Sequence, residues 1–375
     1  MFSQELFGFL SISWQTVVML IIGGVLIYLG IAKNVEPVLL LPIGAGILLT
    51  NIPLSGLIEE GGPFGLLKRA GIETELFPLL IFIGVGAMID FGSLLARPYT
   101  VLLGAAAQFG IFGTFLLVYL VGDGWLHLLP FSLKQAASIG VIGSADGPTS
   151  IYVSSILAPE LLAPIAVAAY SYMALVPIIQ PPIMRLLTTK EERQIKMPTK
   201  EPKISQRMKI LFPIVTIVVV GLIAPKATPL IGCLMFGNLL KESRVVARLS
   251  ATAENELINI VTILLGLTVG GMMVAEQFLK PQTIIVFVMG IVAFALDTAA
   301  GVIFGKIMCF LSRRRINPLI GAAGISAFPM SARVVQKVGL EANPYNHLLM
   351  HAAGANTAGQ IASVVAGGAI LALLL

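Results

Sequence analysis

The sequence predicts an all-α polytopic membrane protein, and three observations support that fold class. Of the 375 residues, 57% are hydrophobic and only 11% are charged, against about 25% charged in an ordinary soluble chain. The mean hydropathy is +0.94. Apolar runs long enough to cross a bilayer as helices begin at Thr16, Leu76, Val101 and Thr283, among other places. Together these runs predict about ten to twelve membrane segments.

The distribution of charge divides the chain into two parts. Much of the net charge of +5 comes from residues 185–209, RLLTTKEERQIKMPTKEPKISQRMK. Because cytoplasmic loops of membrane proteins are enriched in Lys and Arg, we interpret this stretch as a cytoplasmic basic loop rather than a patch for lipid or nucleic acid. It separates an N-terminal membrane repeat, residues 1–184, from a C-terminal membrane repeat, residues 210–375.

Three other features exclude function classes. No Lys or Arg precedes Lys33, so the basic opening of a cleavable signal peptide is missing. Cys233 and Cys309 lie in apolar surroundings and are interpreted as small core residues. His347 and His351 would share a helix face, but no third ligand has suitable spacing, so no transition-metal site is expected.

The two halves of the chain resemble each other in three blocks that occur in the same order. PIGAGILL at Pro42 matches LMFGNLLK at Leu234, residues 72–98 match residues 253–281, and VIGSADGPT at Val141 matches LIGAAGISA at Leu319. The last pair of blocks carries small residues where a helix would be expected. A duplicated membrane chain with one Gly/Pro-broken segment in each half is typical of secondary transporters. We therefore expect two repeats, inverted relative to each other.

The first broken segment, GSADGPTSIY from Gly143, places a carboxylate inside an apolar region. Non-helical backbone is tolerated at membrane depth only where it is buried in protein or lines a wet cavity. Because an ionised carboxylate there costs roughly 2.5 to 3.5 kcal/mol, Asp146 needs a partner or a proton. A hard monovalent cation is one such partner, and the hydroxyls of Ser144, Thr149 and Ser150 lie nearby in the sequence.

Tyr170 and Tyr172 lie well inside the next apolar run. They offer two phenols to an intramembrane site, or they belong to an interfacial aromatic belt. Asp297, in FALDTAAG, is another costly carboxylate. It is either the structural partner of a buried base or a second ion ligand, and the sequence leaves both readings open.

The second half contributes Asn317, Ser326 and Arg333 around its own broken segment. Arg333 lies near the end of that segment, where it either extends its charge to the membrane surface or holds a carboxylate. The last apolar run adds a polar set: His347, His351, Asn356, Thr357 and Gln360. No P-loop, GxSxG, HExxH or Rossmann fingerprint is present. The residues by themselves predict an ion-coupled transporter.

Five segments then indicate a family. GSADGPTSIY, IETELFPLLIFIGVGAMIDFG, LIAPKATPLIGCLMFGNLLKES, ENELINIVTILLGLTVG and NPLIGAAGISAFPMSARVVQ resemble the beta subunit of the sodium-pumping biotin-dependent decarboxylases. This family includes subunits of oxaloacetate, methylmalonyl-CoA and glutaconyl-CoA decarboxylases. The resemblance extends over nearly the whole chain. It leaves the acyl substrate open, because that choice lies on another subunit, although glutaconyl-CoA is slightly favoured.

The resemblance implies an activity and its partners. The beta subunit decarboxylates carboxybiotin, consumes a proton and couples this reaction to sodium export. The biotin is carried by a partner and is not attached to this chain. The implied partners are a carboxyltransferase alpha subunit, a biotin carrier subunit and a small membrane-anchor subunit in the bacterial cytoplasmic (inner) membrane. A homo-oligomer is a further expectation, and no nucleic-acid partner is expected.

The resemblance also implies roles for residues. Asp146 carries over as the sodium-binding aspartate, and Asn317, Gly321 and Ser326 as residues of ion handling. Tyr172 falls on the position assigned to proton delivery, with Tyr170 as a competitor. Arg333 falls on an essential arginine that contacts the carboxylate of carboxybiotin; Asp297 and Asn356 remain secondary candidates. The alternative function is a plain sodium/proton or sodium/solute transporter, which shares the repeat and the buried aspartate.

Overall fold

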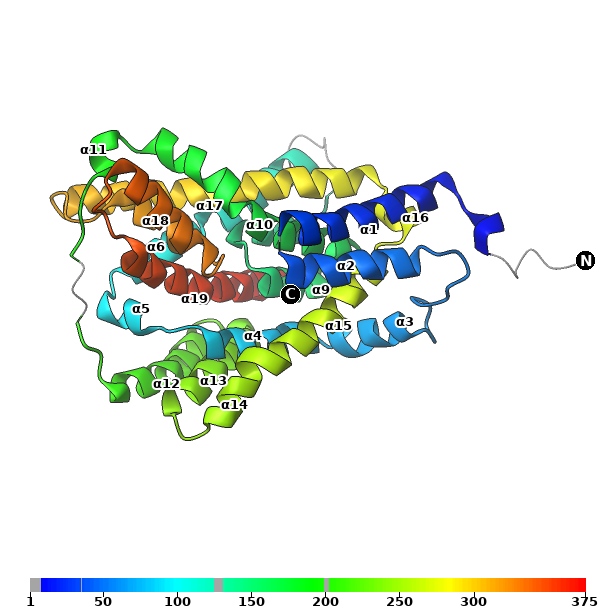
Figure 1. Ribbon diagram of the computed structural model, residues 1–375, viewed down its shortest axis with the longest axis horizontal. Helices are drawn as coiled ribbons and strands as arrows, with labels where there is room; N and C mark the ends of the chain where they lie inside the picture. The colour runs from blue at the N-terminus through cyan, green and yellow to red at the C-terminus, as the bar shows by residue number, and fades with distance from the viewer. Residues whose placement is uncertain (1–7, 35, 125–130, 199–201) are drawn as a thin grey trace, which may run out of the picture.

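The computed structural model describes residues 8–34, 36–124, 131–198 and 202–375, and these residues fold into helices (Figure 1). The helices of the first half run from the amino end to the basic loop in this order: η2 (Gly8–Ser11), α1 (Trp14–Lys33), α2 (Pro37–Thr50), α3 (Pro63–Leu67), η3 (Lys68–Glu73), α4 (Leu76–Met88), α5 (Gly92–Ala96), α6 (Thr100–Ala107), α7 (Phe109–Tyr119), η4 (Leu120–Gly124), α8 (Leu133–Val141), η5 (Ile142–Ser144), α9 (Gly147–Leu157), η6 (Pro159–Leu161), α10 (Leu162–Leu187).

The basic stretch 185–209 contains the end of α10, the short helix α11 (Lys190–Arg193) and the start of α12. The helices of the second half follow: α12 (Gln206–Ile223), η7 (Pro225–Ala227), α13 (Thr228–Ser243), α14 (Ala247–Thr252), η8 (Ala253–Leu257), α15 (Ile258–Gly271), α16 (Ala275–Phe278), α17 (Pro281–Leu311), η9 (Pro318–Gly324), α18 (Met330–Ala342), α19 (Leu349–Leu374).

Six helices in the described part of the chain are long and apolar enough to cross a membrane, or up to eight if each of two bent pairs forms one span. The fold is therefore a polytopic helical membrane protein, as predicted, but the span count is lower than the ten to twelve expected. The difference has a physical reason. Apolar helices such as α2, with 14 residues, and α4, with 13, fall short of the roughly 20 residues that a 30 Å core requires.

Helices from the two halves pack against each other in crossed pairs. α2 packs on α15, and α4 packs on α13. Glycines permit these crossings, since a Cβ on Gly46 or Gly270 would collide with the facing backbone of α15 or α2, and one on Gly86 or Gly237 with that of α13 or α4. Small residues at helix crossings are the usual means of close packing in membranes.

Two pairs of helices, each with one member from either half, run in opposite directions along the molecule. In Figure 1, α4 leads from α3 at the right toward α5 at the left, whereas α15 leads from α14 at the lower left toward α16 at the right. Likewise α10 leads toward α11 at the upper left, and α19 leads from the left to the carboxyl terminus at the centre.

The longest helix, α17, supports both interrupted regions of the chain. It has 31 residues and begins with Pro281 at its first position, where the missing N–H costs no hydrogen bond. It contacts η5 in the first half and η9 in the second half. Gly301 of α17 lies directly against Gly321 of η9 and leaves no room for a Cβ there. α17 thereby positions η5 and η9, the two interrupted regions, relative to each other.

Candidate functional site

The first broken segment joins α8 to α9 through three residues of η5 and a left-handed turn. α8 begins with a capping box formed by Ser132 and Gln135. After η5 the backbone turns at Ala145, which has a φ of 52°. Asp146 then caps α9, accepting a hydrogen bond from the Thr149 N–H at 3.2 Å. Pro148 in the first turn starts the new helix at little cost.

The second broken segment joins η9 to α18 through extended backbone. Asn317 caps η9, and its Oδ1 accepts a hydrogen bond from the Leu319 N–H at 3.0 Å. After Gly324 the chain is extended at Ile325, and α18 starts at Met330. Both interruptions are almost completely buried in protein.

The two broken segments meet. The Ser326 N–H donates to the carbonyl oxygen of Ser144 at 2.9 Å, which joins the second interruption to the first. Residues of α19 form hydrogen bonds with Ile325 and Ser326 in the second interruption. The Ser326 hydroxyl donates to the Gly359 carbonyl at 2.9 Å, the Gln360 amide donates to the Ser326 carbonyl, and the Asn356 amide donates to the Ile325 carbonyl at 2.6 Å.

Asp146 lies at this junction with 4% of its surface exposed. Its Oδ2 accepts hydrogen bonds from the Thr149 hydroxyl at 2.8 Å and from the Ser363 hydroxyl at 2.7 Å. In the described ranges it forms no ion pair with a Lys, Arg or His. A buried charge surrounded only by neutral donors is not neutralised, so this carboxylate calls for a cation or a proton.

Ser363 was missed by sequence reasoning. It lies one helical turn after Gln360 in α19, so it shares a face with a residue that the sequence did single out. The sequence signal that could have identified Ser363 is its spacing, seven residues after Asn356 and three after Gln360 in the same helix.

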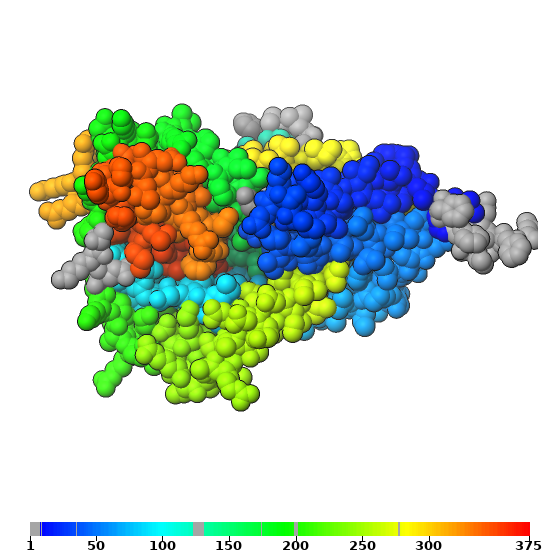
Figure 2. Space-filling model, in the orientation of Figure 1, coloured from blue at the N-terminus to red at the C-terminus, as the bar shows by residue number. Residues whose placement is uncertain are grey.

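Asp146 and Ser326 line a cavity of about 390 Å³, called here the central cavity. Its other wall comes from α2, α4, η8 and α15, including Glu254, Asn259 and Thr262. Figure 2 shows its opening as a recess between α18 in orange, the α1–α2 turn in blue and α15 in yellow-green. The cavity therefore lies between helices of both halves.

The structure separates the two candidate tyrosines. Tyr170 lines the central cavity, and its ring lies so close to Gly147 that a Cβ there would collide with it. Its hydroxyl is buried and has no hydrogen-bond partner within the described part of the chain. Tyr172 points elsewhere: its hydroxyl donates to the Phe287 carbonyl of α17, and its ring covers Gly290. Tyr170 is 4% exposed and Tyr172 is 3% exposed. This burial argues against the interpretation that they belong to an interfacial aromatic belt.

Two of the four ion-handling candidates lie outside the central cavity. The Asn317 amide donates to the carbonyls of Arg193 at 3.0 Å and Ile195 at 2.9 Å, so it ties η9 to the basic loop. Gly321 packs against α17. The structure thus brings Asp146 and Ser326 together but not Asn317 or Gly321.

Arg333 is exposed on α18, one turn after Pro329, which lines the central cavity. It forms no ion pair with any described carboxylate. The four-residue step from Pro329 to Arg333 corresponds to about 6 Å along a helix axis. Arg333 is therefore an exposed cation about one helical turn from Pro329, although it does not itself line the cavity.

The secondary candidates have separate surroundings. Asp297 is fully buried, with its carboxylate against the backbone of Gly110 and Gly143. Within the described residues no basic side chain pairs with it, so the buried base considered as its partner is not found there. Asn356 holds Ile325 through its amide, and its buried Oδ1 has no described partner.

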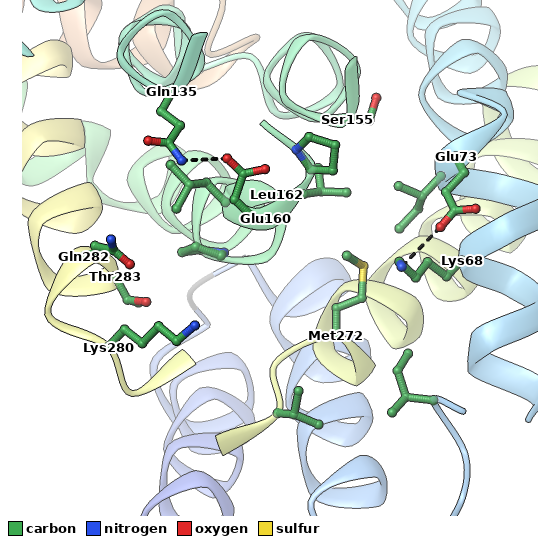
Figure 3. A pocket seen from close by; sticks show the side chains of 16 residues that line it. Lys68, Glu73, Gln135, Ser155, Glu160, Leu162, Met272, Lys280, Gln282 and Thr283 are labelled. Carbon is green, nitrogen blue, oxygen red and sulfur yellow. Dashed lines mark hydrogen bonds and ion pairs between the residues drawn. The ribbon is translucent and has the colours of Figure 1, made fainter. Parts of the chain in front are cut away.

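Two further cavities flank this region. One of about 340 Å³, the loop-side cavity, is lined by Asp90, by Pro202, Ile204 and Lys209 of the basic loop region, and by residues of α19. It shares Met88 and Phe328 with the central cavity. The other, of about 680 Å³, is the far cavity shown in Figure 3, and it shares no lining residue with the central cavity.

Comparisons with known proteins identify the family of this chain. A family model described as the Na⁺-transporting oxaloacetate decarboxylase beta subunit matches residues 15–374. The chain belongs to this family. It is 50% identical to the oxaloacetate decarboxylase beta chain of Haemophilus ducreyi, over 97% of this chain and 96% of that protein.

Relatives named for other substrates are about as similar to this chain as the oxaloacetate decarboxylase beta chain is. The methylmalonyl-CoA decarboxylase subunit beta of Propionigenium modestum is 51% identical over 98% of this chain and 96% of its own. The glutaconyl-CoA decarboxylase subunit beta of Acidaminococcus fermentans is 52% identical over 98% and 95%. The resemblance predicted from five segments is confirmed, and these near-equal identities do not select one acyl substrate.

Proposed function

We propose that this chain is the membrane subunit of a sodium-translocating decarboxylase, which decarboxylates carboxybiotin carried by a partner and couples the reaction to Na⁺ export. One observation carries the proposal. At the junction of two broken segments, Asp146 is buried without a cationic partner among the described residues and lines a cavity with Ser326 and Tyr170. Family membership supplies the decarboxylase side of the reaction.

Sodium binds in this proposal at Asp146, with neutral oxygens around it. Hard cations prefer carboxylate, hydroxyl and carbonyl oxygens. The hydroxyl of Tyr170 is a suitable neutral ligand, because it is buried in the cavity with no hydrogen-bond partner among the described residues. Ser326 supplies a second oxygen from the other half. Asn317 and Gly321 act on the ion through the position of η9, since their contacts are with the basic loop and with α17.

Decarboxylation takes place near the mouth of the central cavity, where Arg333 is free to hold the carboxylate of carboxybiotin. A guanidinium binds a planar carboxylate with two parallel hydrogen bonds. The N–C bond of carboxybiotin breaks, its electron pair stays on the ureido nitrogen, and that nitrogen takes one proton while CO₂ leaves. Because the contact to Arg333 disappears with the carboxylate, the same step releases biotin.

We assign proton delivery to Tyr172 and a sodium contact to Tyr170. In the structure Tyr172 donates its hydrogen to the Phe287 carbonyl of α17. Proton transfer therefore requires that bond to open, which links the chemical step to a movement of α10 relative to α17. Asp297 and Asn356 remain secondary candidates, for a second ion and for the position of Ile325 respectively.

The architecture proposed is a pair of inverted repeats, residues 1–184 and 210–375, around the basic loop 185–209. Three facts support it: matching blocks in the same order, crossed packing of α2 on α15 and of α4 on α13, and opposite running directions of matching helices. In transporters of this type the ion lies where two discontinuous helices meet.

The loop end of the molecule faces the cytoplasm of a bacterial inner membrane in this proposal. That end carries α11 and the exposed residues Arg313, Arg314, Arg315 and Lys337. Cytoplasmic segments of membrane proteins are enriched in such residues. The central cavity adjoins the loop-side cavity at Met88 and Phe328, so sodium enters from the cytoplasm. The partners are a carboxyltransferase alpha subunit, a biotin carrier subunit and a small membrane-anchor subunit.

The experiment that tests this function uses the purified full-length chain in detergent with free carboxybiotin, and follows CO₂ release while sodium is titrated. We expect release to rise with sodium, and the Asp146→Asn variant to lose the sodium dependence. Glu60→Gln is the control, because Glu60 pairs with Arg69 at the surface and lines none of the three cavities described above. Sodium-dependent release that is unchanged in Asp146→Asn would contradict the proposal, as would avidin-insensitive sodium transport without carboxybiotin, which would indicate a plain transporter.

A further inference from the structure

The far cavity, about 680 Å³, shares no lining residue with the central cavity, where the proposed function places sodium. It lies at the end of α9 and the start of α10, beside η3, the end of α15 and the start of α17. We propose that it is the release vestibule, where sodium ions rehydrate and leave on the side opposite the basic loop. This inference rests on the proposed function.

The matching of the two halves leads to this assignment. The loop-side cavity is lined by Met88 at the end of α4, by Asp90 just after it, and by residues in the first half of α19. The far cavity is lined by Met272 and Val274 after α15 and by the first turn of α10. Since α15 and α10 occupy in their own halves the places that α4 and α19 occupy in theirs, the two cavities are counterparts. In inverted repeats the counterpart of the entry cavity opens on the opposite face when the halves exchange conformations.

Helix α9 connects the ion site to the far cavity. Asp146 caps the first turn of α9, and Ser155 near the other end of this helix lines the far cavity. A buried apolar cluster that contains Ile72 of the far cavity, Ile81 of the central cavity, and Ile151 and Val167 between them closes the direct route. The central cavity thus adjoins the loop-side cavity, with which it shares Met88 and Phe328, and is separated from the far cavity by this cluster.

The far cavity has polar and acidic side chains that can contact a hydrated cation, and basic side chains that weaken its binding. Glu160 accepts a hydrogen bond from the Gln135 amide at 2.6 Å, and Glu73 pairs with Lys68 at 3.1 Å. Figure 3 marks both interactions with dashed lines. Gln282 and Thr283 add polar side chains to the lining, and Ser155 also lines the cavity while its hydroxyl donates to the Tyr152 carbonyl at 2.9 Å. Lys68 and Lys280 balance the two carboxylates. An exit must bind the ion only weakly. The two lysines beside the two carboxylates keep sodium binding weak in this proposal.

Accessibility of single cysteines tests the position of the vestibule. In full-length protein with Cys233 and Cys309 replaced by alanine, Ser155→Cys should react with a membrane-impermeant maleimide added to intact cells. Ser154→Cys is the matched control, because Ser154 is fully buried and does not line the cavity. Glu191→Cys, exposed on α11, should react only after the membrane is permeabilised. Gln282→Cys repeats the test from α17 in case Ser155→Cys does not fold.

Sodium on the release side tests the chemistry of the vestibule. In vesicles with the basic loop outward, sodium enclosed in the lumen should slow CO₂ release from external carboxybiotin. Glu160→Gln should raise the half-inhibitory luminal sodium concentration roughly two- to fivefold, without changing the external concentration needed for activation. Glu59→Gln is the control, since Glu59 is exposed nearby but does not line the cavity.

The outcomes of the two inferences can be told apart. Reaction of Ser155→Cys and Gln282→Cys only from the loop side, or from neither side, would overturn the vestibule even if Asp146 proves essential. An unchanged luminal sodium effect in Glu160→Gln would do the same. Loss of the proposed function would instead appear as sodium-dependent CO₂ release in Asp146→Asn, whatever the cysteines show.

Discussion

At the scale of single residues, the hydroxyls of Tyr170 and Tyr172 have different surroundings although only one residue separates them. One faces the Asp146 cavity without a described partner, and the other donates to the Phe287 carbonyl. Tyr170→Phe should therefore raise the sodium concentration for half-maximal CO₂ release, by roughly tenfold for the loss of one ligand to a charged group.

Tyr172→Phe should lower the maximal rate instead, by roughly 10²- to 10⁴-fold if it is the general acid, with little change in the sodium requirement. Steady-state CO₂ release over a sodium titration separates the two effects. If Tyr170→Phe lowered the maximal rate and Tyr172→Phe left it intact, the assignment of the proton donor would have to move to Tyr170.

Asp90, just after the loop end of α4, makes a pH-dependent contribution to the stability of the folded protein. Partial burial by itself would raise the pKa of this carboxyl, but the Gly92 N–H, Lys209 and Lys241 favour the ionised form, and the pKa lies below its usual value. A lowered pKa in the folded state stabilises the protein above the unfolded pKa of about 3.9, and this stabilisation disappears as the pH falls through the folded value.

Asp90→Asn should accordingly lower the free energy of unfolding at neutral pH by less than about 1 kcal/mol, since the pair with Lys209 is largely at the surface. The difference between wild type and variant in apparent melting temperature should persist at about pH 5 and shrink only below about pH 4. A difference that shrank between pH 7 and pH 5 would show that the pKa of Asp90 is not lowered.

At the scale of helices, the crossing of α4 and α13 depends on Gly86 and Gly237. A Cβ on Gly237 would collide with the Ile83 carbonyl of α4. Gly237→Ala should therefore destabilise the protein by roughly 1–3 kcal/mol, the usual cost of overpacking. The apparent melting temperature of purified protein in detergent measures this effect.

Gly232→Ala on the same helix is the control. No atom lies within 4 Å of the Cβ that this change adds. Alanine is a better helix former than glycine by about 1 kcal/mol, so this variant should be as stable as wild type or more stable. Equal melting temperatures for Gly237→Ala and Gly232→Ala would show that α4 and α13 do not approach as closely as the structure has them.

The helices also show how far the sequence could predict the fold. Hydropathy predicted a helical membrane protein, and the repeated blocks predicted interruptions at GSADGP and GAAG, where η5 and η9 are found. It overestimated the number of spans because the length of an apolar run does not reveal whether a helix stops partway. α2 ends after 14 residues at Thr50, in an environment that only the packing of α1 and α15 determines.

The candidate site was predictable only where a residue is unusual for its environment. Asp146 stands out because a carboxylate in an apolar run is costly. Ser363 does not, because a serine in a membrane helix is common and its contact with Asp146 spans 217 positions of sequence. The separation of Tyr170 from Tyr172 likewise follows from the rotation of α10 against α17, and sequence spacing does not fix that rotation.

At the scale of the whole molecule, one reaction must move charge across a membrane. Export of one sodium ion against 100 mV costs about 2.3 kcal/mol. Decarboxylation can drive it only if carboxybiotin and sodium favour opposite conformations of the same protein. The broken segments suit this requirement, since they join Asp146, the proposed sodium ligand, to α18, which carries Arg333.

The most direct test measures both processes in the same vesicles. Protein is reconstituted with the basic loop outward, carboxybiotin is added outside, and CO₂ release and uptake of radioactive sodium into the lumen are followed together. We expect sodium to accumulate only while CO₂ is released, and both to be lost in Asp146→Asn but not in Glu60→Gln. Sodium uptake that continues in Asp146→Asn, or CO₂ release from wild type that moves no sodium, would contradict the coupling through Asp146.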